Sequence, residues 1–202
     1  MKKYLFSTTI VLSILSCTLS FAQNKDIQYV QVYALNMRSG PGLEFEKTGT
    51  IFLNTKVQIL SQEEAWLEIQ ADDTLRGWIA GNFVGGSPIT GFERDKLLFL
   101  DGNLNAKIRA VNAMTKEQDG ESFEFLKNYV LIQEQNSLGL DIDKVILPEI
   151  FRGWANNDIE PAISILIYLM DHDIGGEIGQ STDSVLELRI AAKEAIKVLV
   201  RE

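Results

Sequence analysis

The chain of 202 residues, with 46% hydrophobic residues and a formal net charge of -9, has the length of one or two folded domains. This charge favours solubility and also suits a basic partner, but it argues against nucleic acid and anionic lipid surfaces, which repel like charge. The single histidine and single cysteine leave no zinc motif, and no phosphate-binding loop is present.

The first 22 residues have the pattern of a secretory signal peptide. Lys2 and Lys3 form a basic start, an apolar run follows, and Ser20 and Ala22 supply small residues at positions -3 and -1. The apolar run is shorter than the roughly 20 residues that a membrane-spanning helix needs. We therefore expect cleavage after Ala22 and a mature protein that is periplasmic or secreted from a bacterium, with a retained N-terminal anchor as the alternative.

Cys17 is the only cysteine and lies inside this expected signal peptide. Residues 14–17 loosely resemble a lipoprotein processing site, but Leu15 is bulky where small residues are usual. Lipid anchoring at Cys17 is therefore less favoured than cleavage, and it is the one route by which we expect membrane attachment. After cleavage the chain has no cysteine, so packed cores rather than disulfides must stabilise it.

Residues 28–84 contain short β-rich runs, several with the apolar and polar alternation of half-buried strands. The predicted strands are residues 29–33, 48–52, 56–60, 66–69 and 76–80. Residues 35–42 break the pattern, because Pro41 fixes φ while Gly40 and Gly42 permit positive φ, which predicts a tight loop. So small an all-β unit is expected to close into a barrel, which removes exposed strand edges.

Residues 28–84 resemble the bacterial SH3 domain (SH3b) family. Residues 35–42, LNMRSGPG, are similar to the family signature LNVRSGPG, and the four later runs match family strands in the same order and spacing: TGTI at 48–51, KVQIL at 56–60, WLEI at 66–69 and GWIAGNFV at 77–84. Ala65 stands where the family usually has glycine. The resemblance implies an SH3-like β-barrel that binds cell-wall peptides or other proteins.

For most residues of the predicted barrel a structural role is favoured over a role in ligand binding. Alternation makes five of them core candidates: Met37, Ile59, Leu67, Ile69 and Ile79. Arg38 is expected to brace the loop by hydrogen bonding to carbonyls rather than to contact a ligand, and Trp78 is expected to face the core in part. Trp66, Tyr33 and Phe83 are the better candidates for an exposed aromatic groove, since aromatic rings suit peptides and sugars. The full set of groove candidates is Tyr33, Asn36, Arg38, Trp66, Trp78, Asn82 and Phe83.

The composition changes after the breaker cluster at residues 85–88, and the apolar spacing becomes helical. The predicted organisation is a signal peptide at 1–22, the barrel at 23–86, a linker at 87–93 and an all-α domain at 94–202. Six helices are expected near residues 93–100, 104–114, 121–133, 144–154, 159–170 and 183–199. Asp119 can cap the third helix, and Pro148 predicts a kink or break in the fourth.

The helical domain shows weak signs of repetition. Residues 188–196 resemble the second helix of a HEAT-type repeat, and residues 105–114 are a weaker copy. Arg109 and Arg189 are separated by two periods of about 40 residues, whereas Arg152 lies near the middle period without the surrounding motif. The expected fold is therefore an SH3-like barrel followed by helical hairpins, either a HEAT-like solenoid or a non-repetitive bundle.

The sequence indicates no catalytic, metal or cofactor site. His172 lies between two aspartates, but the EF-hand spacing fails because Thr182 stands where a glutamate is needed, so a polar loop is expected. We therefore predict a non-catalytic binding or scaffolding protein whose barrel recognises a peptide or cell-wall material and whose helices dock a protein partner. The expected partner is a cell-wall peptide or an envelope protein. The alternative is a cell-wall hydrolase, or a hydrolase activator, with an unrecognised helical domain.

Overall fold

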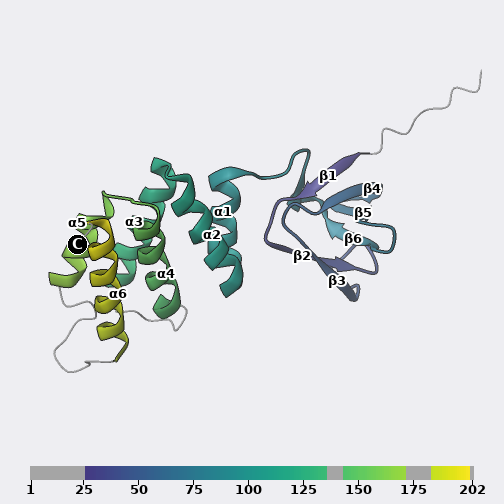
Figure 1. Cartoon of the computed structure of the whole chain (residues 1–202). Helices are drawn as coiled ribbons and strands as arrows, with labels where there is room; N and C mark the ends of the chain where they lie inside the picture. Colours follow the sequence, from purple (N-terminus) through teal and green to yellow (C-terminus); the bar gives the residue numbers. More distant parts are fainter. Residues whose placement is uncertain (1–25, 136–142, 172–182, 201–202) are drawn as a thin grey trace, which may run out of the picture.

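The computed structural model in Figure 1 describes residues 26–135, 143–171 and 183–200. Within these residues seven strands come first and six helices follow. The expected division into an antiparallel β unit and an α-helical unit is confirmed. The expected signal peptide, Cys17 and His172 lie outside the described residues. None of the described helices is long and apolar enough to cross a membrane.

All seven strands belong to one curved antiparallel sheet, which we call the barrel. Its strands stand in the order β3-β2-β6-β5-β4-β1-β7. Their bounds are β1 (Ile27–Val30), β2 (Ala34–Arg38), β3 (Lys47–Phe52), β4 (Lys56–Glu63), β5 (Trp66–Gln70), β6 (Arg76–Ala80) and β7 (Val84–Gly85), with a 3-10 turn η1 (Gly81–Phe83) before β7.

Alternate residues of these strands form one apolar core, as the period of two requires. Leu67 lies opposite Ile79 across β5 and β6, and Ile69 follows two residues later on the same face. Four of the five predicted core residues are buried, and Ile59 packs against them half-buried. The buried set is Val30, Leu35, Met37, Ile51, Val57, Leu67, Ile69 and Ile79.

The predicted loop at residues 35–42 is wrong in its first half. Residues up to Arg38 form β2, which pairs with β3 along its length and with β6 at Arg38. Leu35 and Met37 point into the core while Asn36 is exposed, so this segment alternates like any half-buried strand. The loop proper begins at Ser39. The two-residue β7 was also missed, because so short a strand has no periodicity.

The segment after β7 is held against the barrel. Asn54, which turns the chain after β3 with a φ of 64°, donates from Nδ2 to the Ile89 carbonyl at 2.7 Å. The Ile89 amide donates back to Asn54 Oδ1 at 2.8 Å, and Gln31 Nε2 donates to the Ser87 carbonyl at 2.9 Å. The first part of the predicted linker is therefore fixed by side-chain hydrogen bonds.

The six predicted helices are all present, and we call them the helical domain. Their bounds are α1 (Gly91–Asp101), α2 (Leu104–Glu117), α3 (Gly120–Gln135), α4 (Asp143–Asn156), α5 (Ala162–Asp171) and α6 (Asp183–Leu199). Helix α1 therefore begins inside the predicted linker. A kink or a break was predicted at Pro148. This residue lies inside α4 without ending it, so the break is wrong and the kink stays a prediction.

The α2–α3 and α4–α5 connections repeat with an offset of 40 residues, although the consecutive helices that pack most closely are α1 with α2 and α5 with α6. The turns contain Gln118 and Asp158, each with a φ of 53°. Buried residues match at the same offset, since Val111 corresponds to Phe151 and Leu126 to Leu166. Helices α2, α4 and α6 pack successively against one another (Figure 1). The offset between these two turns equals the predicted period, but the HEAT-like repeat stays a prediction, because Glu149 and not Arg152 occupies the position 40 residues after Arg109.

Asp119 caps α3 as predicted, and its removal should weaken the helical domain. The Ser122 amide and hydroxyl donate to its carboxylate at 2.7 and 2.6 Å. We expect Asp119→Ala to lower the free energy of unfolding by about 0.5–2 kcal/mol, because an N-cap acceptor is lost. Urea unfolding followed by far-UV circular dichroism measures this cost.

The cost of Asp119→Ala should also depend on pH. Burial raises the pKa of the Asp119 carboxyl, but the hydrogen bonds from Ser122 outweigh it and hold this pKa below its ordinary value. The stabilisation from the ionised cap is therefore complete above the unfolded value of about pH 4 and is lost as pH falls through the folded value. An undiminished cost at about pH 2 would contradict this explanation.

Candidate functional site

The outer face of the sheet brings four of the predicted groove residues together. Arg38 on β2 lies directly opposite Trp78 on β6, and Trp78 in turn lies opposite Glu68 on β5. Trp66 lies opposite Ala80, so the two tryptophans are diagonal neighbours on adjacent strands, within reach of aromatic side chains. We call Arg38, Trp66, Glu68, Trp78 and Ala80 the tryptophan face. Asn36 extends it along β2.

Both indoles of the tryptophan face are half-buried. Trp78 therefore does not enter the core, because its inward neighbour Ile79 takes that position. The small Ala80 side chain beside Trp66 leaves the ring of Trp66 without a bulky cross-strand neighbour on that side. This arrangement offers apolar surface on a rigid sheet, which is the geometry that suits flat contact with a sugar ring or a peptide.

A charged pair fixes the middle of the tryptophan face. Arg76 donates to Glu68 Oε1 from Nε at 3.0 Å and from Nη2 at 2.8 Å, and Ser61 donates to Oε2 at 2.9 Å. The hydrogen bonds from Arg76, followed by that from Ser61, lower the pKa of the Glu68 carboxyl. An exposed pair of this kind adds little stability, but it holds a carboxylate and a guanidinium at fixed places beside the indoles.

Arg38 braces the loop at residues 39–46, as the sequence indicates. Its Nη1 donates to the Leu43 carbonyl at 2.9 Å and to the Phe45 carbonyl at 2.7 Å. The ring of Phe45 lies against Gly40, where a Cβ atom would stand 2.3 Å from Cδ1. The loop is thus folded back on the sheet, and Leu43, which is 76% exposed, is displayed on it.

The remaining candidates lie around this face or away from it. Asn82 and Phe83 belong to η1, whose Gly81 amide donates to the Ala65 carbonyl at 2.8 Å, next to Trp66. Phe83 is 38% exposed. Tyr33 lies in the β1–β2 connection, at the opposite end of β2 from Arg38, and its ring contacts Phe52 edge to face at 6.1 Å. The seven candidates therefore do not form one groove.

Four exposed apolar residues of the barrel, Ile27, Leu43, Phe45 and Phe52, were not among the sequence candidates, and Leu43 and Phe52 are the most exposed of them. Phe52 is 53% exposed at the end of β3, and Leu43 follows the Gly-Pro-Gly turn. Alternation would have found Phe52, because its neighbour Ile51 faces the core. No periodic signal marks Leu43, since it lies in a loop.

Within the described residues, no group of three or more histidine, cysteine, aspartate or glutamate side chains is placed to hold a metal ion. The paired acids Glu63 and Glu64 lie at the end of β4 and in the following turn. Asp72 accepts hydrogen bonds from the Thr74 amide and hydroxyl and from the Leu75 amide, which lower the pKa of its carboxyl. The hydrogen bonds within this turn therefore give the Asp72 carboxylate a structural role.

The bacterial SH3 domain family matches residues 34–85, which span β2 to β7. This segment is therefore a bacterial SH3 domain, and the protein carries a binding module of that class. Strand β1 precedes the matched segment but completes its sheet by pairing with β4 and β7. No curated protein and no solved structure matches the chain.

Gly40→Ala should destabilise the barrel through its loop. The new Cβ would lie within 2.7 Å of three atoms of the Phe45 ring, so the ring must move and with it a carbonyl that Arg38 binds. We expect a loss of about 1–3 kcal/mol in the free energy of unfolding, as for other overpacked sites. Thermal unfolding monitored by tryptophan fluorescence measures it. Gly86→Ala is the matched control, because nothing lies within 4 Å of a Cβ there.

Proposed function

We propose that this protein is a non-catalytic binding protein of the bacterial cell envelope, exported to the periplasm or beyond. Its SH3 domain binds cell-wall peptide through the tryptophan face, and its helical domain docks a protein partner. The observation that carries the proposal is the pair of half-buried indoles on adjacent strands, beside a carboxylate and a guanidinium held in place by each other. Export is supported by the basic and apolar pattern of the first 22 residues.

The chemistry of the tryptophan face suits a short peptide. The indoles provide contact area at low cost in conformational entropy. Glu68 and Arg76 present opposite charges at fixed positions, which can select the ends or side chains of a zwitterionic peptide. The helical domain supports protein docking because α2, α4 and α6 pack in succession, and stacked helices present extended surfaces.

Retention on purified peptidoglycan tests the wall-binding part. We expect the wild-type chain to be retained at low salt and Trp66→Ala to bind about 30-fold more weakly, the usual effect of losing a central aromatic contact. Phe52→Ala is the matched control, since it removes an exposed ring of the same barrel away from the tryptophan face. A wild-type chain that is not retained, or equal retention of Trp66→Ala, would overturn this part of the proposal.

Zymography on the same wall material tests the absence of catalysis. Clearing by the wild-type chain that disappears on replacing an acidic residue of the helical domain would favour the alternative, a cell-wall hydrolase. Cell fractionation tests the location, with recovery in the periplasm or medium expected. Recovery with the membrane that is abolished by Cys17→Ser would instead indicate a lipid anchor.

A further inference from the structure

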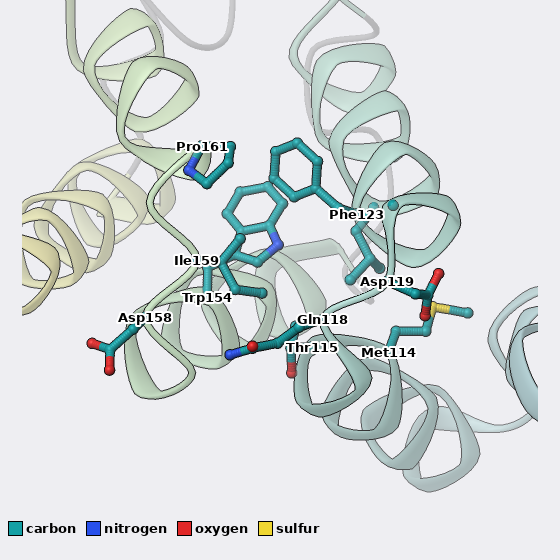
Figure 2. Close-up of a pocket in the computed structure, with 11 residues that line it drawn as sticks. Met114, Thr115, Gln118, Asp119, Phe123, Trp154, Asp158, Ile159 and Pro161 are labelled. Carbon is teal, nitrogen blue, oxygen red and sulfur yellow. The ribbon is translucent and has the colours of Figure 1, made fainter.

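The helical domain contains a cavity of about 270 Å³ between its two left-handed turns. Figure 2 shows the α2–α3 turn with Gln118 and Asp119 on one side and the α4–α5 turn with Asp158 and Ile159 on the other. The two turns are joined by a hydrogen bond from the Gln118 side chain to the Asn157 carbonyl. The cavity is therefore framed by two repeated turns that are tied together.

A buried donor without a partner lies in the wall of this cavity. Trp154 is completely buried, and its Nε1 has no hydrogen-bond acceptor among the described residues. Its ring stacks on Phe151 and is tilted against Phe123, with ring centroids 6.0 and 5.8 Å apart. Figure 2 shows the nitrogen-bearing edge of the indole turned toward the α3 side of the cavity, where Phe123 and Asp119 lie. A buried donor of this kind is stabilised by any acceptor that enters.

Two acidic residues, Asp119 and Asp158, line the cavity, and among the described residues no lysine, arginine or histidine lines it. Figure 2 shows the Asp158 carboxylate turned away from Trp154, at the outer side of its turn. The Asp119 carboxylate is held by Ser122 at the start of α3, while Asp158 is exposed. The rest of the lining is mostly apolar, with Met114, Ile159 and Pro161 among its residues. A ligand that is complementary to this cavity would therefore have an apolar body, a hydrogen-bond acceptor at its tip and a positive charge next to it.

We propose that this cavity binds a basic peptide, which inserts one side chain with an apolar body and an oxygen at its tip. The oxygen accepts the hydrogen bond of Trp154 Nε1, and the flanking basic residues of the peptide lie against Asp119 and Asp158. This inference rests on the proposed docking role of the helical domain and gives that role a site and a ligand chemistry.

The probe is a set of four capped tripeptides added to the full chain. Acetyl-Arg-Tyr-Arg-amide presents the complete pattern. Replacing its tyrosine by phenylalanine removes the oxygen, replacing it by glycine removes the inserted group, and replacing its arginines by glutamates reverses the charge. We expect saturable binding of the tyrosine peptide, binding about tenfold weaker for the phenylalanine peptide, and no binding of the other two.

The indole N–H resonance of Trp154 reports occupancy directly. The chain has three tryptophans, and Trp154→Phe identifies the resonance of this one by removing it. The tyrosine peptide should move this resonance more than those of Trp66 and Trp78. The phenylalanine peptide should move it less, because it brings no acceptor. Trp154→Phe should bind the tyrosine and phenylalanine peptides equally, since the donor that distinguishes them is gone.

Gly120→Leu tests access to the cavity. Gly120 is one of the lining residues, and a Cβ there has nothing within 4 Å, so there is space for a larger side chain beside the cavity. We expect this variant to lose peptide binding, whereas Gly86→Leu, which is equally open but outside the helical domain, keeps it. Asp158→Asn should weaken binding of the tyrosine peptide, because asparagine accepts the left-handed φ while it removes the charge.

Several outcomes would overturn the proposal. A Trp154 resonance that no peptide moves, with a cross-relaxation signal to water, would show that only ordered water occupies the cavity. Binding that survives Gly120→Leu would place the peptide elsewhere. Peptidoglycan retention by the wild-type chain separates the two proposals: retention without binding of the tyrosine peptide would overturn only the cavity proposal, whereas peptide binding without retention would overturn only the wall-binding role.

Discussion

Trp154→Ala is expected to lower the free energy of unfolding of the helical domain by about 3–5 kcal/mol. The Trp154 side chain is fully buried and contacts Phe151 and Phe123 from α4 and α3. Its removal would merge the space of the indole with the neighbouring cavity, and the lost contacts cannot be recovered by a small local collapse. Urea unfolding followed by far-UV circular dichroism, which reports the helices, measures the loss.

Trp154→Phe is the matched control for this prediction. Phenylalanine keeps most of the apolar volume and removes the unpaired indole donor, so we expect a change smaller than about 1.5 kcal/mol. The barrel should unfold at an unchanged midpoint in both variants, because no strand–helix pair of the described residues packs extensively. A cost of Trp154→Ala as small as that of Trp154→Phe would show that the indole is not part of the core. A shift of both transitions would show that the two domains unfold together.

The helices could be predicted because each carries its own signals. In α6 the residues Leu188, Ala192, Ala195 and Leu199 form one buried stripe at helical spacing. Asp119 marked the start of α3 because an acidic N-cap binds amides within its own turn. Both signals are local in the sequence. Pro148 misled for the same reason: its local rule predicts a break, but α4 is packed against α2 and α6 and continues.

The tryptophan face could be predicted only in part. Alternation indicates that Trp66 and Glu68 share one side of β5, since Leu67 between them faces the core. That Arg38 lies opposite Trp78 depends on the pairing of β2 with β6, which are not consecutive in the chain. No local pattern contains that information. Strand β2 was also not predicted, because the glycines and proline at residues 40–42 indicate a loop, whereas Leu35 and Met37 just before them alternate as in a strand.

The cavity could not be predicted from sequence patterns. It needs Gln118 and Asp158 to adopt positive φ in two turns 40 residues apart, and it needs those turns to stack. Neither residue is a glycine, so the sequence does not indicate that their φ angles are positive. From the sequence, Trp154 is predicted only as an apolar residue at the end of a helix. Its unpaired nitrogen becomes visible only when all its neighbours are placed.

Ile69→Ala should destabilise the barrel by about 2–5 kcal/mol. Ile69 is fully buried in the central strand β5, opposite Ile59 on β4 and Gly77 on β6. A domain of this size has a small free energy of unfolding, so we expect a substantial unfolded fraction of the Ile69→Ala variant at about 37 °C. Tryptophan fluorescence during urea unfolding measures the effect, since Trp66 and Trp78 lie on the other side of the same sheet.

Gln70→Ala is the control, because Gln70 follows Ile69 on β5 but points outward and is only half-buried. We expect it to change the free energy of unfolding by no more than about 0.5 kcal/mol. The two variants also separate stability from binding: Ile69→Ala should lose peptidoglycan retention in proportion to its unfolded fraction, and retention should return on cooling. Trp66→Ala should lose retention at every temperature while remaining folded. Loss of retention by a fully folded Ile69→Ala variant would mean that the core, rather than the tryptophan face, shapes the binding surface.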